Sequence, residues 1–257
     1  MTKRSWMARP FGAALLLWTA GTAGTAATAA IAVGAAFAIG AANAADDGAD
    51  VVVAMVRRVF SAPEATARVT IERSDPFGGP PAREQGRIWF LPGRGLRYRS
   101  AEKGGQDLVI DRAKDSFSMY SSQEEVLYRG AYGRAPARLR RLIEEPEEAL
   151  SRKLSPEAER RDVRGTARDG HRLRADALGE KAGKMSLWIS RDSGSGLPRF
   201  VSLASDVDTV LVEFREWKLH SKARAADLVS SAPRGAREEP LDPREFLERA
   251  GPGGKSR

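Results

Sequence analysis

Apolar and polar residues alternate along much of this chain, with a period of two residues. Such alternation is typical of strands that bury one face. The gaps between successive segments are turns of Gly, Asp, Lys or Ser, which are too short to hold a crossover helix. We therefore expect an antiparallel meander. Its strands are predicted at 67–75, 86–91, 95–100, 107–111, 116–121 and 124–130, and later at 171–178, 184–190, 199–205 and 208–220.

A period of three to four residues marks the predicted helices. The apolar residues of the segment 50–61 recur at this spacing until Pro63, which ends the helix. Residues 135–162 predict two short helices separated by Pro146, and a further short helix is expected near 243–250. Strands with one apolar face have to cover that face, and these few helices can do so. The predicted fold class is α+β, an open (incomplete) antiparallel β-barrel covered by a lid of short helices.

The first 44 residues have the layout of a secretory signal. Basic residues occur near the start, no charged residue occurs from Phe11 to Ala44, and the small residues Ala42-Asn43-Ala44 offer a cleavage site. We expect export and cleavage after Ala44. An uncleaved membrane anchor is the alternative, because the uncharged stretch is long enough to span a bilayer. Beyond the signal we expect one domain over 45–237 and a charged, flexible tail over 238–257.

Composition narrows the classes of partner. The chain has a formal net charge of +8 and no cysteine. It therefore has no disulfides, and its stability has to come from an ordinary core. Basic runs are diluted by acids, as in "RRLIEEPEE", and an exported chain rarely meets nucleic acid, so we expect solvated faces and no nucleic-acid partner.

Catalytic chemistry finds little support in the sequence. The two histidines, His171 and His220, lie in separate predicted strands about fifty positions apart. A lone strand histidine is usually structural. No nucleophile elbow, phosphate-binding loop or zinc-binding histidine pair is present. We expect no catalytic residue, no metal, no cofactor and no enzymatic activity.

The segment 89–130 resembles the family of periplasmic outer-membrane lipoprotein carriers, the LolA-like chaperones. The family pattern is a strand, a Pro-Gly turn and an apolar-Arg-aromatic triplet. Here Pro92-Gly93 precede Leu96-Arg97-Tyr98. Downstream, "RAPARLRRLIEE" matches the Pro-initiated lid helix of the family, "GSGLP" matches a strand turn, and residues 233–236 match a closing Pro-x-Gly-Ala.

This resemblance implies a periplasmic carrier that holds the acyl chains of a lipoprotein between barrel and lid and moves them toward the outer membrane. Acyl chains gain about 0.8 kcal/mol per methylene removed from water, so such cargo needs an escort. The implied partners are the lipidated cargo, an inner-membrane release complex and an outer-membrane acceptor, with the carrier itself a monomer. A non-protein lipid or glycolipid cargo, or a lipid-sensing regulatory role, stays open as the alternative.

The resemblance also implies site residues. Arg97 matches the family arginine that hydrogen-bonds to the lid and latches the closed state. Strand alternation, however, places Arg97 with Arg99 on the face opposite Leu96 and Tyr98, so a solvated strand face is the alternative. The predicted lining of the lipid cavity is Ile88, Phe90, Leu96, Tyr98, Phe117, Met119, Leu139, Leu142, Ile143, Leu187, Ile189, Val212 and Phe214.

Overall fold

The computed structural model describes residues 47–75, 77–103, 105–135, 137–144, 157–174, 186–204 and 209–243. Three expectations lie outside the described residues. They concern the signal over 1–44, the part of the second short helix before residue 157, and the chain beyond residue 243.

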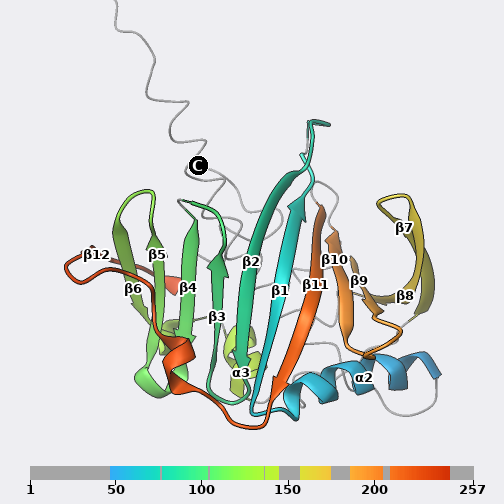
Figure 1. Cartoon of the computed structure of the whole chain (residues 1–257), viewed down its shortest axis with the longest axis horizontal. Helices are drawn as coiled ribbons and strands as arrows, with labels where there is room; N and C mark the ends of the chain where they lie inside the picture. Colours follow the sequence, from blue (N-terminus) through green and yellow to red (C-terminus); the bar gives the residue numbers. More distant parts are fainter. Residues whose placement is uncertain are drawn as a thin grey trace, which may run out of the picture.

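The described strands form one 12-stranded sheet, in the order β12-β6-β5-β4-β3-β2-β1-β11-β10-β9-β8-β7. It does not close on itself (Figure 1). Neighbouring strands pair antiparallel, except that β12 runs parallel to β6. The strands are β1 (Glu64–Arg73), β2 (Ala82–Leu91), β3 (Gly95–Ser100), β4 (Gln106–Asp111), β5 (Ser116–Ser121), β6 (Val126–Ala131), β7 (Glu157–Val163), β8 (Thr166–Arg174), β9 (Ser186–Arg191), β10 (Pro198–Ala204), β11 (Thr209–His220) and β12 (Arg237–Pro240).

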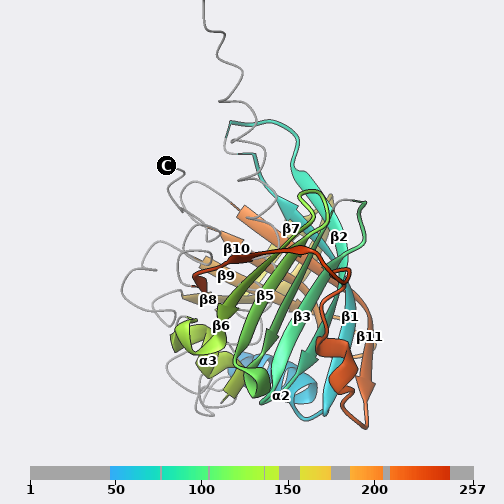
Figure 2. The ribbon, with the colours of Figure 1, turned by 90° about the vertical axis from the view of Figure 1, so that its left-hand side faces the viewer.

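Helices are few among the described residues. They are α2 (Asp47–Phe60), α3 (Ala137–Glu144) and the short 3-10 turns η1 (Arg112–Lys114), η2 (Tyr132–Arg134) and η5 (Ala225–Leu228). The sheet is curved, and α2 and α3 lie on its concave side (Figure 2). The meander, the first helix and the helix that follows residue 136 are confirmed close to their predicted positions.

One helical prediction was wrong. Residues 157–162 were expected to end a helical pair, but they form β7, which pairs with β8. Arg164 and Gly165 both have positive φ, 56° and 74°, which suits the tight turn of a β-hairpin. The residues of β7 favour a helix by composition, and pairing within the sheet overrides that preference.

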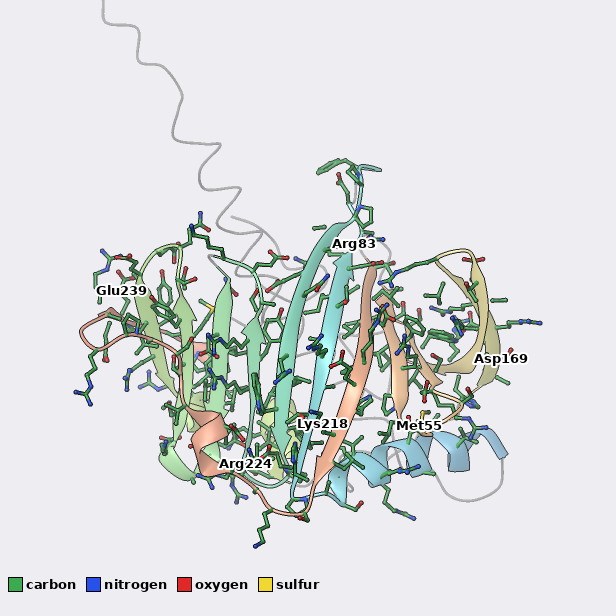
Figure 3. All side chains as sticks on the ribbon, viewed as in Figure 1. Met55, Arg83, Asp169, Lys218, Arg224 and Glu239 are labelled. Carbon is green, nitrogen blue, oxygen red and sulfur yellow. The ribbon has the colours of Figure 1, made fainter. Side chains whose placement is uncertain are left out.

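The expected tail begins with a strand. Residues 237–240 form β12, which pairs with β6 and covers that edge of the sheet. Glu239 of β12 and Asp169 of β8 lie at opposite sides of the molecule (Figure 3). Leu241 then donates its backbone N–H to the carbonyl of Arg129 at 2.7 Å. The described chain is therefore anchored to the sheet beyond residue 237.

The convex face carries two small apolar clusters and a network of charges. Val163, Trp188 and Phe200 form one cluster, and Leu91, Val109 and Leu228 form the other. The carboxylate of Glu213 is buried and binds the guanidinium groups of Arg164, Arg199 and Arg215. Burial alone would raise the pKa of Glu213, but the hydrogen bonds from Arg215 and Arg164 hold this pKa below its ordinary value.

Candidate functional site

A single apolar cluster occupies the concave face of the sheet. Its members come from strands on both halves of the sheet and from α2 and α3. The predicted cavity residues that belong to it are Ile88, Phe90, Leu96, Tyr98, Phe117, Met119, Ile143, Leu187, Ile189, Val212 and Phe214, each at most 4% exposed. Leu139 and Leu142 lie on α3, but the structure does not describe their side chains, so their predicted place in the cavity stays a prediction. The pattern of alternation therefore placed the described side chains on one continuous surface.

The helix α2 packs across one end of this surface. Val52, Met55 and Val59 are at most 1% exposed and share the cluster with the strands. The ring of Phe60 meets that of Phe90 edge to face, with centroids 4.8 Å apart. Figure 3 labels Met55 on this helix. Because α2 buries large apolar side chains along its length, it is a firmly attached cover.

The described contacts of the short helix α3 involve Arg140, Ile143 and Glu144. The N–H of Gly93, in the turn between β2 and β3, donates to the carbonyl of Ile143 at 2.9 Å. The hydroxyl of Tyr132 donates to the carbonyl of Arg140 at 3.2 Å and to Glu144 Oε1 at 3.0 Å. Burial and the bond to Glu144 raise the pKa of Tyr132, so its hydroxyl stays protonated. Ile143 supplies a buried apolar contact.

In the described part of the chain, the contacts of Arg97 are with other elements than α3. Its Nε and Nη2 atoms donate to the two carboxylate oxygens of Asp107 at 2.8 and 2.9 Å, and Nη1 donates to the carbonyl of Asp227 at 3.4 Å. The guanidinium also lies 5.0 Å from the ring centroid of Trp89. The side chain is buried and faces the convex side, as strand alternation requires. The resemblance implied that Arg97 hydrogen-bonds to the lid, whereas the observed partners are Asp107 and Asp227.

The segment that Arg97 holds is the chain after β11. It begins near Arg224, labelled in Figure 3, whose N–H donates to Glu64 Oε2 at 2.7 Å. It crosses in front of β3 and β4 with η5, on the side of the sheet away from α3 (Figures 1 and 2). The N–H of Ser231 also donates to Asp107 Oδ2. The Arg97–Asp107 pair therefore fixes the C-terminal segment to the convex face.

The concave face also holds a buried polar pair. The hydroxyl of Tyr98 donates to Glu84 Oε1 at 2.8 Å, and burial together with the charge of Glu84 raises the pKa of Tyr98 well above its usual value. Gly86 makes room for this contact. A Cβ atom there would lie 2.6 Å from the Tyr98 ring and 2.6 Å from the carbonyl oxygen of Arg99.

The histidines form no relay. His220 Nε2 lies 3.4 Å from Thr66 Oγ1 and 3.8 Å from Glu64 Oε1, so one ring nitrogen faces both groups. A relay would use the two ring nitrogens separately. Burial and the charge of Arg191 lower the pKa of His171. Among the described residues, no group of three His, Cys, Asp or Glu side chains is arranged to hold a metal ion. None of the helices in that part of the chain is both long and apolar enough to cross a membrane.

Comparison with known proteins gives structural neighbours only. The chain matches no family model and no curated protein. It resembles a solved LolA superfamily protein from Nitrosomonas europaea at 8% identity, with a TM-score of 0.40, covering 72% of this chain and 99% of that one. LprF from Mycobacterium bovis matches at 10% identity and a TM-score of 0.37, over 71% and 94% of the two chains.

Solved structures similar to this chain thus include a LolA superfamily protein and a lipoprotein-sorting protein domain. An uncharacterized conserved protein from Thermus thermophilus is also similar, at 14% identity and a TM-score of 0.45, over 74% of this chain and 96% of that one. At these identities the function has to be argued from this chain's own residues.

Sequence reasoning missed Glu84, Gln106 and the contacts of α3. Glu84 shares its strand face with Ile88 and Phe90, so the alternation of β2 could have placed it on the concave side. The bond between Gly93 and α3 joins backbone groups far apart in the chain. Such a contact leaves no pattern in the side chains.

Proposed function

We propose that this protein is an acyl-chain carrier of the bacterial envelope, which shelters the lipid chains of a lipoprotein against the concave face of its sheet. The observation that carries the proposal is the continuous apolar cluster on that face, built from strands β1 to β5 and β9 to β11. Acyl chains need concave apolar surface and few polar groups. The resemblance at Leu96-Arg97-Tyr98 supports the same role.

The helix α3 would act as the lid. In the described chain its firm contacts are the Gly93–Ile143 bond, the two bonds from the Tyr132 hydroxyl and the buried side chain of Ile143. Arg112 adds a partly exposed ion pair with Glu144 at 3.8 Å. A net hydrogen bond contributes about 1 kcal/mol, so this attachment can open at modest cost and expose the cluster. The helix α2, which buries Val52, Met55 and Val59 in the cluster, would be the fixed wall.

The remaining parts of the proposal concern the path of the cargo. We place the protein in the periplasm after cleavage at Ala44, as a monomer that receives cargo from an inner-membrane release complex and delivers it to an outer-membrane acceptor. We assign no catalytic residue, no cofactor and no nucleic-acid partner. Arg97 is assigned to the C-terminal segment rather than to the lid, because its guanidinium already binds Asp107 and Asp227.

The first test is direct binding of a synthetic triacylated lipopeptide to the protein prepared without detergent. We expect a soluble one-to-one complex on gel filtration, whereas the same peptide without acyl chains should elute alone. Mass spectrometry of organic extracts from the protein isolated from its native envelope then identifies the cargo. If those extracts contain a non-protein lipid, the carrier function stands and the cargo is that lipid rather than a lipoprotein. Failure to bind any acylated molecule would refute the proposal.

The lid is tested by a matched pair of tyrosine variants. Tyr132→Phe removes the hydroxyl that holds α3, and uptake of the lipopeptide should become several-fold faster. Tyr128→Phe is the control, because the hydroxyl of Tyr128, on β6, donates to Glu124 Oε2 at 2.9 Å, and its hydrogen bond in the described chain does not involve α3. Equal uptake rates in both variants would remove α3 from the role of lid, while the binding test would still decide the carrier role.

A further inference from the structure

Polar residues gather at one end of the concave face, far from α2. Phe90 of β2 contacts Phe60 of α2. Glu84 precedes Phe90 by six residues on the same strand, which is about 20 Å along an extended chain. We call the polar band five concave-face residues at this end, Glu84, Tyr98, Ser100, Gln106 and Ser121. Arg73 of β1 lies on the same face, two residues beyond Ile71, which pairs with Glu84.

The strand register brings the members of the polar band together. Ser100 lies opposite Gly86, beside the Tyr98–Glu84 pair. Gln106 lies opposite Ser121, and its neighbour Asp107 pairs with Arg99 of β3. Gln106 and Ser121 share a face with Leu108 and Met119, which belong to the apolar cluster. The concave face is therefore apolar toward the helices and polar at its other end.

Gln106 carries an unexplained polar atom. The residue is 7% exposed, and its Oε1 atom is buried without a hydrogen-bond partner in the described chain. A buried acceptor left unpaired costs free energy, and native proteins rarely keep one unless something else binds it. This oxygen is aimed at the face that the proposed cargo would occupy.

Glu84 offers a second acceptor. Its residue is 9% exposed, and its hydrogen bond among the described residues is the one that Oε1 accepts from Tyr98. The second carboxylate oxygen is left to accept from another donor. Two acceptors at the same end of the concave face, on β2 and β4, favour a ligand that donates hydrogen bonds, and the carboxylate disfavours an anion.

We propose that the polar band binds the uncharged head group of an acyl lipid, one that carries hydroxyl or amide N–H donors, while its chain lies along the apolar cluster toward α2. This inference rests on the proposed carrier function and adds the class of head group. Such donors would satisfy Gln106 Oε1 and the second oxygen of Glu84. A few well-placed polar groups in an apolar site fix the orientation of a ligand.

Four ligands with one oleoyl chain isolate the effect of the head group. They are 1-oleoylglycerol, oleamide, oleate and 1-oleoyl-lysophosphatidate. Binding is followed by isothermal titration calorimetry. We expect the glycerol and amide ligands to bind at least about tenfold more tightly than the two anions. Arg73 lies on the same face beyond Ile71, so tighter binding of the anions would overturn the proposal in favour of a phosphate or carboxylate site.

Two variants test the named residues. Gln106→Met keeps the side-chain length without the acceptor and should weaken binding of 1-oleoylglycerol about fivefold. Glu84→Gln retains an oxygen for Tyr98 but removes the charge, and should narrow the gap between oleamide and oleate. Ser118→Ala is the control, since Ser118 is 7% exposed on the opposite face of β5.

The outcomes separate this inference from the carrier function. If all four ligands bind equally and neither variant changes their affinities, the polar band does not read the head group, and an ordered water satisfies Gln106; the carrier function would then stand. If no oleoyl ligand and no lipopeptide binds, both proposals fail together.

Discussion

Replacing Asp107 with alanine should destabilise the fold by about 3–5 kcal/mol and release the C-terminal segment from the convex face. Asp107 is 2% exposed and Arg97 is 8% exposed, so the pair is almost completely out of water. Without the carboxylate, the described contacts left to the guanidinium are the Asp227 carbonyl at 3.4 Å and the ring of Trp89. The cost is therefore mainly that of an uncompensated buried charge, together with the lost bond to Ser231.

Two assays measure this change. Urea unfolding gives the free energy of unfolding, and limited digestion with trypsin reports on the segment, because Arg224 and Arg234 flank the residues that Asp107 holds. We expect faster cleavage at these arginines in Asp107→Ala. Arg68→Ala is the control, since it breaks an ion pair with Glu216 whose side chains are 60% and 53% exposed. That variant should cost less than about 1 kcal/mol.

The same experiment separates two roles for Arg97. If the guanidinium anchors the C-terminal segment, Arg97→Met should weaken the fold and leave lipopeptide uptake unchanged in rate. If it latches the lid, the variant should speed uptake and leave trypsin cleavage unaltered. A cost below about 1 kcal/mol for Asp107→Ala, with wild-type cleavage, would refute the reasoning about the buried pair.

Two further predictions concern pH and packing. The pKa of Glu213 is lowered in the folded chain, so its contribution to stability is complete above the ordinary value of about 4.3 and is lost as the pH falls through its folded-state pKa. Melting temperatures between pH 7 and pH 3 should therefore fall less steeply in Glu213→Gln, and identical slopes would contradict this. Gly86→Ala should cost about 1–3 kcal/mol by urea unfolding, because its Cβ would meet backbone and ring atoms at 2.6 Å. Gly133→Ala, whose Cβ would find its nearest neighbour at 3.5 Å, should be close to neutral.

The position of β12 bears on how the sheet avoids aggregation. Without it, β6 would present unpaired backbone groups along an edge. Residues 237–240 cover that edge, and Pro240 lacks an N–H for a further partner. The strand is short and carries charged side chains at Arg237, Glu238 and Glu239. These features discourage a second chain from adding to the sheet.

The local pattern of apolar and polar residues was sufficient to predict most strands and the face of each that is apolar. Val69 and Ile71, or Leu187 and Ile189, alternate with residues of the other face, and a two-residue period leaves one solution for which side is buried. The same rule placed Arg97 opposite Leu96 and Tyr98, and the structure agrees with it. Periodicity carries this information because side-chain direction in a strand depends only on position.

The contacts of the polar groups could be seen only in the tertiary structure. Residues 157–162 form a strand because they pair with β8. Arg97 is buried because a segment 130 residues later in the chain packs over it. The tether between Gly93 and Ile143 joins backbone atoms, which every residue possesses. The sequence by itself determined which face of each strand is apolar, because that choice is local. Which polar groups are buried, and by what, was decided by the folding of distant segments against each other.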